Sequence, residues 1–201
     1  MKALILVDIQ NDFLPDGALA VPKGDQIIPL INTLQSKFDL VVASQDWHPE
    51  NHASFASNHA NKNEFDVIQL EGQDQVLWPN HCVQGTPGAA FSSSLNTDAV
   101  AAIFRKGMTV TVDSYSAFFD NNKTQHTGLE AYLKSMKVTE VYVCGLAADY
   151  CVYFTAKDAQ SLGFKTYYIT DATRYISETV YQDAILDLKQ HGVTILNSSE
   201  I

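Results

Sequence analysis

One cysteine lies where a polypeptide can make a thiol reactive. Cys151 follows the apolar run 140–144 and a turn of small residues, and it precedes a segment with helical periodicity. A thiol at the start of a helix lies near the positive end of the helix dipole and near free backbone N–H groups, which stabilise a thiolate and bind an oxyanion. Cys151 is therefore a candidate nucleophile. The alternative is the ordinary one for an unpaired cysteine, a small buried apolar residue.

Two charged residues follow other apolar runs. Asp8 ends the run 2–7, where it could accept a proton from the thiol or could simply end a strand and begin a turn. Arg105 and Lys106 come directly after the run 101–104. A solvated basic turn is the ordinary alternative for such a lysine. A cation on an apolar strand is nevertheless unusual in an acidic chain, so Lys106 is also a candidate.

A carboxylate and several imidazoles suggest a metal site. Asp46 and His48 form an Asp-x-His pair whose side chains point to the same side of an extended segment, and His81 follows in a second polar segment. Zinc, iron and manganese accept such ligands. The pair alone is weak evidence, because most histidines in loops are surface or hydrogen-bonded groups. We interpret three others in that way, namely His59, His126 and His191.

The segments that must position these residues alternate between strand and helix patterns. Strand-like runs occupy 2–8, 40–44, 101–104, 140–144, 165–169 and 193–196, and helical periodicity occupies 27–38, 128–137, 150–162 and 178–191. This alternation predicts an α/β fold, a mostly parallel sheet flanked by helices. No long periodic segment appears between 46 and 94, which favours functional loops there. The candidate residues follow strands, so they should meet at the carboxyl edge of the sheet.

Composition limits the remaining possibilities. The 201 residues are 46% hydrophobic and 18% charged, which is typical of a globular protein and predicts a single domain over residues 1–201. The net charge of −10 argues against nucleic acid or an anionic membrane as a partner. Three cysteines without a signal-peptide profile predict no disulfide framework and a cytoplasmic protein. Whether the chain is a monomer or a homo-oligomer stays open.

Six motifs occur in one order over nearly the whole chain. They occupy residues 7–13, 45–49 with 51–52, 78–82, 105–107, 113–118 and 145–152. With these motifs the sequence resembles the nicotinamidase branch of the isochorismatase-like cysteine hydrolases. The resemblance implies a three-layer sandwich of the isochorismatase-like type.

The same resemblance implies a role for each candidate. It makes Cys151 the nucleophile, Asp8 the base and Lys106 the cation that supports the charged state. Backbone N–H groups of Ala147 and Cys151 would form the oxyanion hole, and the peptide bond between Leu146 and Ala147 would be cis.

A metal ion and an aromatic pocket are also implied. Asp46, His48 and His81 would hold one divalent ion, with zinc expected first and iron or manganese as alternatives. A further ligand from His52 or Ser54 is left open. The substrate ring would lie between aromatic walls formed by Phe13, Trp78 and Tyr115.

The activity implied by the resemblance is an amidohydrolase reaction. Nicotinamide would be hydrolysed to nicotinic acid and ammonia through a cysteine thioester, in NAD salvage. Two alternatives remain at this point. One is another amidase of the same superfamily, acting for example on ureido or carbamoyl compounds, and the other is a non-catalytic metal-binding protein on this fold. Activity on pyrazinamide is left open.

Overall fold

Six parallel strands form the central sheet of the computed structural model, which describes residues 1–201. They lie in the order β5-β2-β1-β6-β7-β8. Their bounds are β1 Lys2–Val7, β2 Leu40–Asp46, β5 Val100–Lys106, β6 Glu140–Gly145, β7 Lys165–Thr173 and β8 Thr194–Leu196. The sequence predicted all six, although β7 continues four residues beyond the expected end at 169. The mostly parallel sheet is therefore confirmed.

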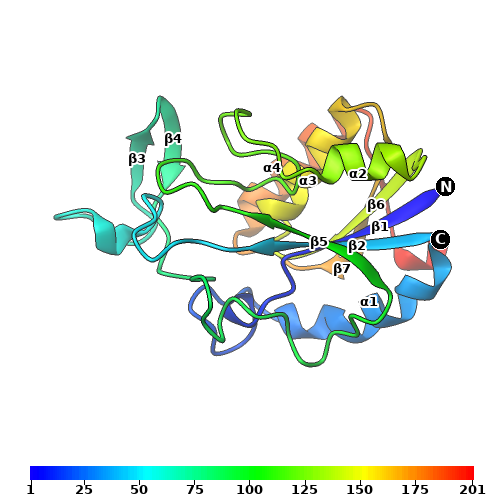
Figure 1. The fold of residues 1–201 in the computed structure, drawn as a ribbon, viewed down its shortest axis with the longest axis horizontal. Helices are drawn as coiled ribbons and strands as arrows, with labels where there is room; N and C mark the ends of the chain where they lie inside the picture. Colours follow the sequence, from blue (N-terminus) through cyan, green and yellow to red (C-terminus); the bar gives the residue numbers. More distant parts are fainter.

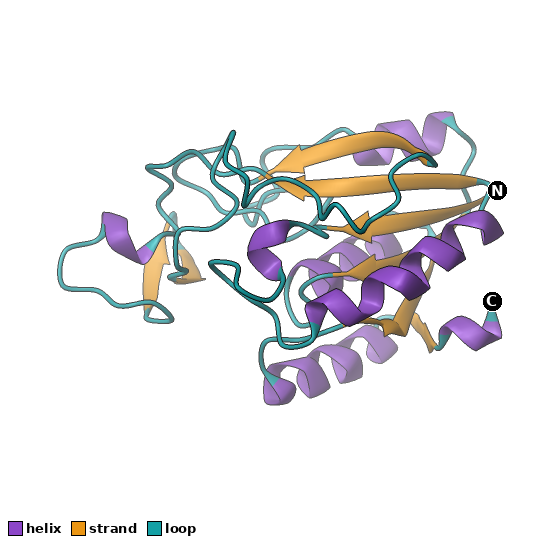
Figure 2. Ribbon diagram, turned by 90° about the horizontal axis from the view of Figure 1, so that it is seen from below, coloured by secondary structure: helices purple, strands orange, loops and turns teal.

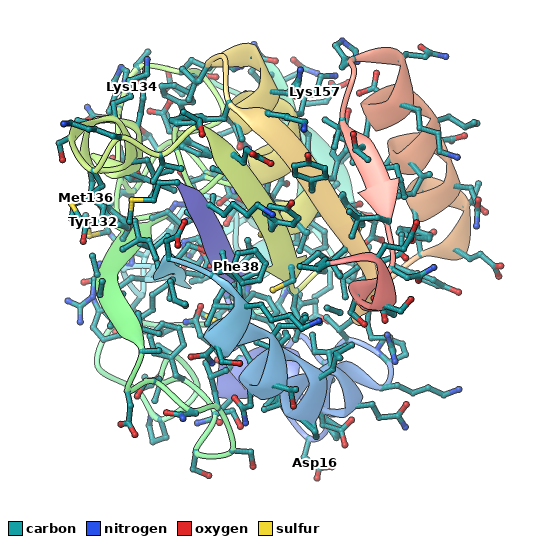
Figure 3. The ribbon with its side chains drawn as sticks, turned by 90° about the vertical axis from the view of Figure 1, so that its right-hand side faces the viewer. Asp16, Phe38, Tyr132, Lys134, Met136 and Lys157 are labelled. Atoms are coloured by element: carbon teal, nitrogen blue, oxygen red, sulfur yellow. The ribbon has the colours of Figure 1, made fainter.

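Helices cover both faces of this sheet. The four are α1 Ile28–Leu34, α2 Leu129–Ser135, α3 Cys151–Ser161 and α4 Glu178–Gln190. Figure 1 shows α1 below the sheet and α2, α3 and α4 above it, and Figure 3 shows the same layers from the side of the two termini. The α1 segment is shorter than the periodicity predicted, because 3-10 turns precede and follow it. No helix has the length and apolar character required to cross a bilayer.

The alternation of side chains along β1 explains the two cores. Leu4 and Leu6 join one buried cluster with α1, whereas Ala3 and Ile5 join a second cluster with α2, α3 and α4. Both clusters exclude water from β1, since these four residues are all fully buried. A strand buried on both faces requires the continuous apolar run seen in the sequence.

A short antiparallel hairpin lies outside the main sheet. Its strands are β3 Val67–Leu70 and β4 Gln73–Val76, and Glu71 and Gly72 form the turn with φ values of 49° and 82°. Positive φ at both turn residues matches the twist of a hairpin. The sequence analysis missed these strands because each has only four residues and half of their side chains are exposed. Figures 1 and 2 place the hairpin beyond the carboxyl ends of the parallel strands.

Gly145 allows β6 to leave the sheet beside β1. Its φ is 118°, and a Cβ atom at this position would lie 2.1 Å from the carbonyl oxygen of Val7. Only glycine fits such a close backbone approach. The chain then continues into the segment that leads to Cys151, so the end of β6 and the end of β1 deliver their residues to the same place.

The two-sided core makes β1 the most sensitive strand. We expect Leu4→Ala to lower the free energy of unfolding by about 2–5 kcal/mol, because the truncated side chain leaves a cavity. Urea denaturation measures this loss. Leu186→Ala is the matched control, since Leu186 on α4 is 58% exposed, and it should change stability by no more than about 0.5 kcal/mol. Equal losses in the two variants would contradict the proposed core.

Candidate active site

A buried ammonium lies at the centre of the site. Lys106 is 2% exposed and comes from the last position of β5. Its Nζ atom lies 2.9 Å from Asp8 Oδ2, 3.0 Å from Asp46 Oδ1 and 3.4 Å from Cys151 Sγ. It also donates a hydrogen bond of 2.8 Å to the carbonyl oxygen of Ser114. The structure thus brings together the three residues expected to form the triad.

The two carboxylate oxygens of Asp8 have different surroundings. Its Oδ1 accepts a 2.6 Å hydrogen bond from the hydroxyl of Ser44 on β2. Apart from the ion pair with Lys106, Oδ2 has no hydrogen-bond partner. Burial raises the pKa of the Asp8 carboxyl above its ordinary value, although the Lys106 ammonium opposes this shift. A raised pKa makes the carboxylate a stronger proton acceptor.

Cys151 begins α3 and lines a largely apolar pocket. Burial raises the pKa of its thiol well above the ordinary value; Lys106 opposes this, while Asp8 adds to it. The helix start and the ammonium favour a thiolate, whereas desolvation and the neighbouring carboxylates favour the thiol.

Backbone N–H groups stand free beside the thiol. The peptide bond from Leu146 to Ala147 is cis, as the resemblance implied. Ala148 and Tyr150 donate their N–H groups to backbone carbonyls, whereas Ala147 and Cys151 have no such acceptor. Two N–H groups that have no acceptor and lie next to a thiol can bind an oxyanion.

A carboxylate and two imidazoles converge on one point near Lys106. The Nε2 atoms of His48 and His81 lie 2.9 Å and 3.3 Å from Asp46 Oδ2. On the far side of each ring, Nδ1 lies within hydrogen-bond distance of a carbonyl oxygen, that of Gly107 at 2.9 Å for His48 and that of Pro79 at 2.8 Å for His81. All three side chains are buried, with exposures of 4% or less.

This cluster fits a cation. Carbonyl oxygens only accept hydrogen bonds, so each Nδ1 atom carries a hydrogen. When the rings are neutral, the Nε2 lone pairs of His48 and His81 face the Asp46 carboxylate, which also only accepts. Three acceptors in contact repel one another unless a positive charge lies among them. A carbonyl partner for the second ring nitrogen is also the usual support of a metal-binding histidine.

Gly107 leaves room for this cluster. With φ of 68°, a Cβ atom at Gly107 would lie 2.4 Å from Cε1 of His48. His52 and Ser54 lie on its other side, where Ser54 Oγ is 2.7 Å from His52 Nδ1. The Nε2 atom of His52 is buried without a partner and groups with His48 and Asp113. Burial, with His48 nearby, lowers the pKa of His52 to about 4, so its ring is neutral.

An aromatic pocket connects the two charged clusters. Phe13, Trp78 and Tyr115 line it, together with His81 and Cys151. The Trp78 and Tyr115 rings meet edge to face with centroids 6.3 Å apart, and the Phe13 ring lies 5.5 Å from the His81 ring. The further lining residues are Leu19, Asp46, Asp113, Ala147, Tyr150 and Ile176. The pocket is therefore largely apolar and adjoins both the Cys151 thiol and the Asp46–His48–His81 cluster.

Comparisons with known proteins agree with this geometry. The model of the isochorismatase domain matches residues 2–200. The chain belongs to the isochorismatase family. Within this family it is 48% identical to the nicotinamidase of Acinetobacter baylyi, over 99% of this chain and 94% of the relative. The family resemblance drawn from the six motifs is thus confirmed.

Two solved structures of the isochorismatase family show the same fold. A nicotinamidase pyrazinamidase of Acinetobacter baumanii superposes with a TM-score of 0.97 at 47% identity, covering 99% of this chain and 97% of that one. A pyrazinamidase of Pyrococcus horikoshii in complex with zinc superposes with a TM-score of 0.79 at 40% identity, covering 98% of each chain.

The sequence analysis did not identify three polar residues that contribute to the site. Gln10 accepts the backbone N–H of Asp46 at 2.8 Å and donates to its carbonyl oxygen at 2.8 Å, which fixes the end of β2. Ser44 holds Asp8, and Asp113 lines the pocket. Ser44 and Gln10 could have been noticed, because each is a polar residue at or just after the end of an apolar run.

The shared ammonium generates a prediction about stability. Lys106→Met leaves Asp8 and Asp46 buried without their common cation, so we expect the metal-free protein to lose about 3–5 kcal/mol in the free energy of unfolding. Urea denaturation of metal-free samples measures the loss. Lys157→Met serves as control, because the Lys157–Asp187 pair is partly exposed and such a pair contributes about 0–1 kcal/mol. A Lys106→Met protein as stable as the control would show that the carboxylates do not need this partner.

Proposed function

We propose that the protein is a nicotinamidase, which hydrolyses nicotinamide to nicotinic acid and ammonia for NAD salvage. The observation that carries this proposal is an aromatic pocket that adjoins both a Cys–Lys–Asp cluster and a carboxylate–imidazole cluster. The first can attack a carboxamide, and we propose that the second faces the nitrogen of a pyridine ring. The relatives named nicotinamidase support the same assignment.

Binding in this proposal orients a flat ring. Phe13, Trp78 and Tyr115 hold its faces and edges by apolar contact. Three residues would hold one divalent ion, namely Asp46, His48 and His81. Such an ion supplies a Lewis acid for the ring nitrogen, and we propose zinc because a zinc-bound pyrazinamidase shares the fold. Fixing the ring in this way aims the carboxamide at Cys151.

The first half of the reaction forms a thioester. Asp8 Oδ2 takes the thiol proton as Cys151 Sγ attacks the carboxamide carbon. The N–H groups of Ala147 and Cys151 receive the negative charge that develops on the carbonyl oxygen. Asp8 then gives its proton to the departing nitrogen, the C–N bond breaks, and ammonia leaves. Throughout, the Lys106 ammonium balances charge that moves between Asp8 and the sulfur.

The second half returns the enzyme to its starting state. Asp8 takes a proton from a water molecule, whose oxygen attacks the thioester carbon. The same oxyanion donors stabilise the tetrahedral species. The C–S bond then breaks, the sulfur recovers the proton from Asp8, and the carboxylic acid is released. Asp8 therefore passes on each proton that it takes within the same half-reaction, from the thiol to ammonia in the first and from water to the sulfur in the second.

The nucleophile is tested by replacing Cys151 and a second buried cysteine in separate variants. Cys151→Ala should reduce ammonia release from nicotinamide by more than about 10³-fold, while the circular dichroism spectrum and nicotinamide binding persist. Cys144→Ala is the matched control, since Cys144 is equally buried but lies inside β6, and it should keep most of the rate. A Cys151→Ala enzyme that retains more than a few per cent of the wild-type rate would exclude Cys151 as the nucleophile.

The metal cluster is tested by the choice of substrate. Benzamide carries the same amide as nicotinamide but has no ring nitrogen, so kcat/KM should be lower for benzamide by a factor on the order of 10⁴ in the metal-loaded enzyme. His48→Ala should erase most of this preference by slowing nicotinamide far more than benzamide, with metal content measured in parallel. His191→Ala is the control, because His191 is exposed and follows the carboxyl end of α4. Comparable rates on the two amides in the metal-loaded wild type would instead favour a broader amidase.

A further inference from the structure

Gln75 is a buried polar residue on an otherwise exposed hairpin. It is 3% exposed, whereas its strand neighbours Gln73 and Asp74 are exposed and Val76 is half-buried. Its side chain contacts residues that line the aromatic pocket, although Gln75 does not itself line it.

The Gln75 amide has a fixed orientation. Its Nε2 atom lies 2.7 Å from the carbonyl oxygen of Val76 and 3.0 Å from Oδ2 of Asp113. Both partners only accept hydrogen bonds, so each takes one of the two N–H groups of the amide. An amide with its oxygen and nitrogen exchanged would place its oxygen against these two acceptors. The hydroxyl of Tyr115 lies 3.0 Å from the same nitrogen. Gln75 therefore touches two residues that line the pocket.

Tyr115 and Asp113 are held from further directions. The indole Nε1 of Trp78 donates a 3.2 Å hydrogen bond to the Tyr115 hydroxyl. Asp113 Oδ1 accepts the backbone N–H of Ser114 at 2.7 Å. The Gln75 amide bridges the Asp113 carboxylate and the Tyr115 hydroxyl. Asn121 links only the backbones of the same two residues: its N–H donates to the carbonyl oxygen of Asp113 at 2.7 Å, and its Oδ1 accepts the N–H of Tyr115 at 3.0 Å. Without Gln75, the Asp113 carboxylate would lose a partner inside a buried site, and the Tyr115 hydroxyl would lose its contact with the hairpin.

We propose that Gln75 is a positioning residue for the substrate ring, which couples the β3–β4 hairpin to the pocket walls through Asp113 and Tyr115. This inference rests on the proposed nicotinamidase function. Gln75 acts on binding and not on bond breaking, because none of its partners is Cys151, Asp8 or Lys106. The hairpin thus becomes part of the substrate site although it lies outside the central sheet.

The test replaces the amide by an apolar chain of similar length. Gln75→Met should raise KM for nicotinamide at least about fivefold while kcat stays within about twofold, because the walls are loosened but the triad is untouched. Gln73→Met is the matched control, at an exposed glutamine two residues earlier on the same strand, and should leave both constants unchanged. Ammonia release measures both variants.

A spectroscopic measurement separates positioning from general destabilisation. The chain has two tryptophans, Trp47 and Trp78, so a Trp47→Phe background leaves Trp78 as the sole indole reporter. In that background, Gln75→Met should shift Trp78 emission and weaken its response to nicotinamide. If Gln75→Met does not fold, Tyr115→Phe removes the shared hydroxyl while keeping the ring, and it should raise KM in the same way.

Each outcome decides the matter. A folded Gln75→Met enzyme with the KM of the wild type, or a variant that loses kcat while keeping KM, would overturn the proposal. So would a Tyr115→Phe enzyme with unchanged KM. These outcomes are distinct from failure of the proposed function, which would appear as a wild-type enzyme that releases no ammonia from nicotinamide.

Discussion

The site depends on one buried ammonium shared by two carboxylates. Lys106 pairs in register with Asp46 across β5 and β2, and Asp8 follows the end of β1 on the next strand. Burying any one of these charges alone would cost several kcal/mol, whereas together they compensate one another. The strand order β5-β2-β1 therefore allows the cluster to be buried, because it places the opposite charges next to one another. Ser44 holds the Asp8 carboxylate, and Gln10 fixes the backbone of Asp46.

This sharing explains how one pocket can hold two kinds of chemistry. The ammonium lies 3.4 Å from the Cys151 sulfur and 3.0 Å from the Asp46 carboxylate, so the thiol and the Asp46–His48–His81 cluster contact the same atom. Burial raises the pKa of the thiol, and the proposed reaction accordingly includes proton transfer from Cys151 to Asp8.

Sequence patterns predicted the main sheet because its strands are continuous apolar runs. They marked Asp8, Lys106 and Cys151 as candidates because the first two follow such runs and Cys151 follows the turn after one; the triad itself was implied by the family resemblance. The hairpin was missed because four-residue, half-exposed strands leave no periodic signal. Gln75 was missed for a related reason, since a lone glutamine in a polar segment reveals nothing until its partners 38 and 40 residues away are known. The desolvation of Cys151 was also beyond reach, because it depends on how the fold buries the thiol.

The central claim is that the amide is cleaved through a thioester on Cys151, and single-turnover mass spectrometry tests it most directly. Excess enzyme is mixed with nicotinamide and acid-quenched at successive times, and the intact mass and peptide map are recorded alongside ammonia release. The account predicts that ammonia appears together with a chain heavier by one nicotinoyl group, carried on the peptide that contains Cys151. Release of the first equivalent of ammonia from an unmodified chain, or acylation of a different residue, would contradict it.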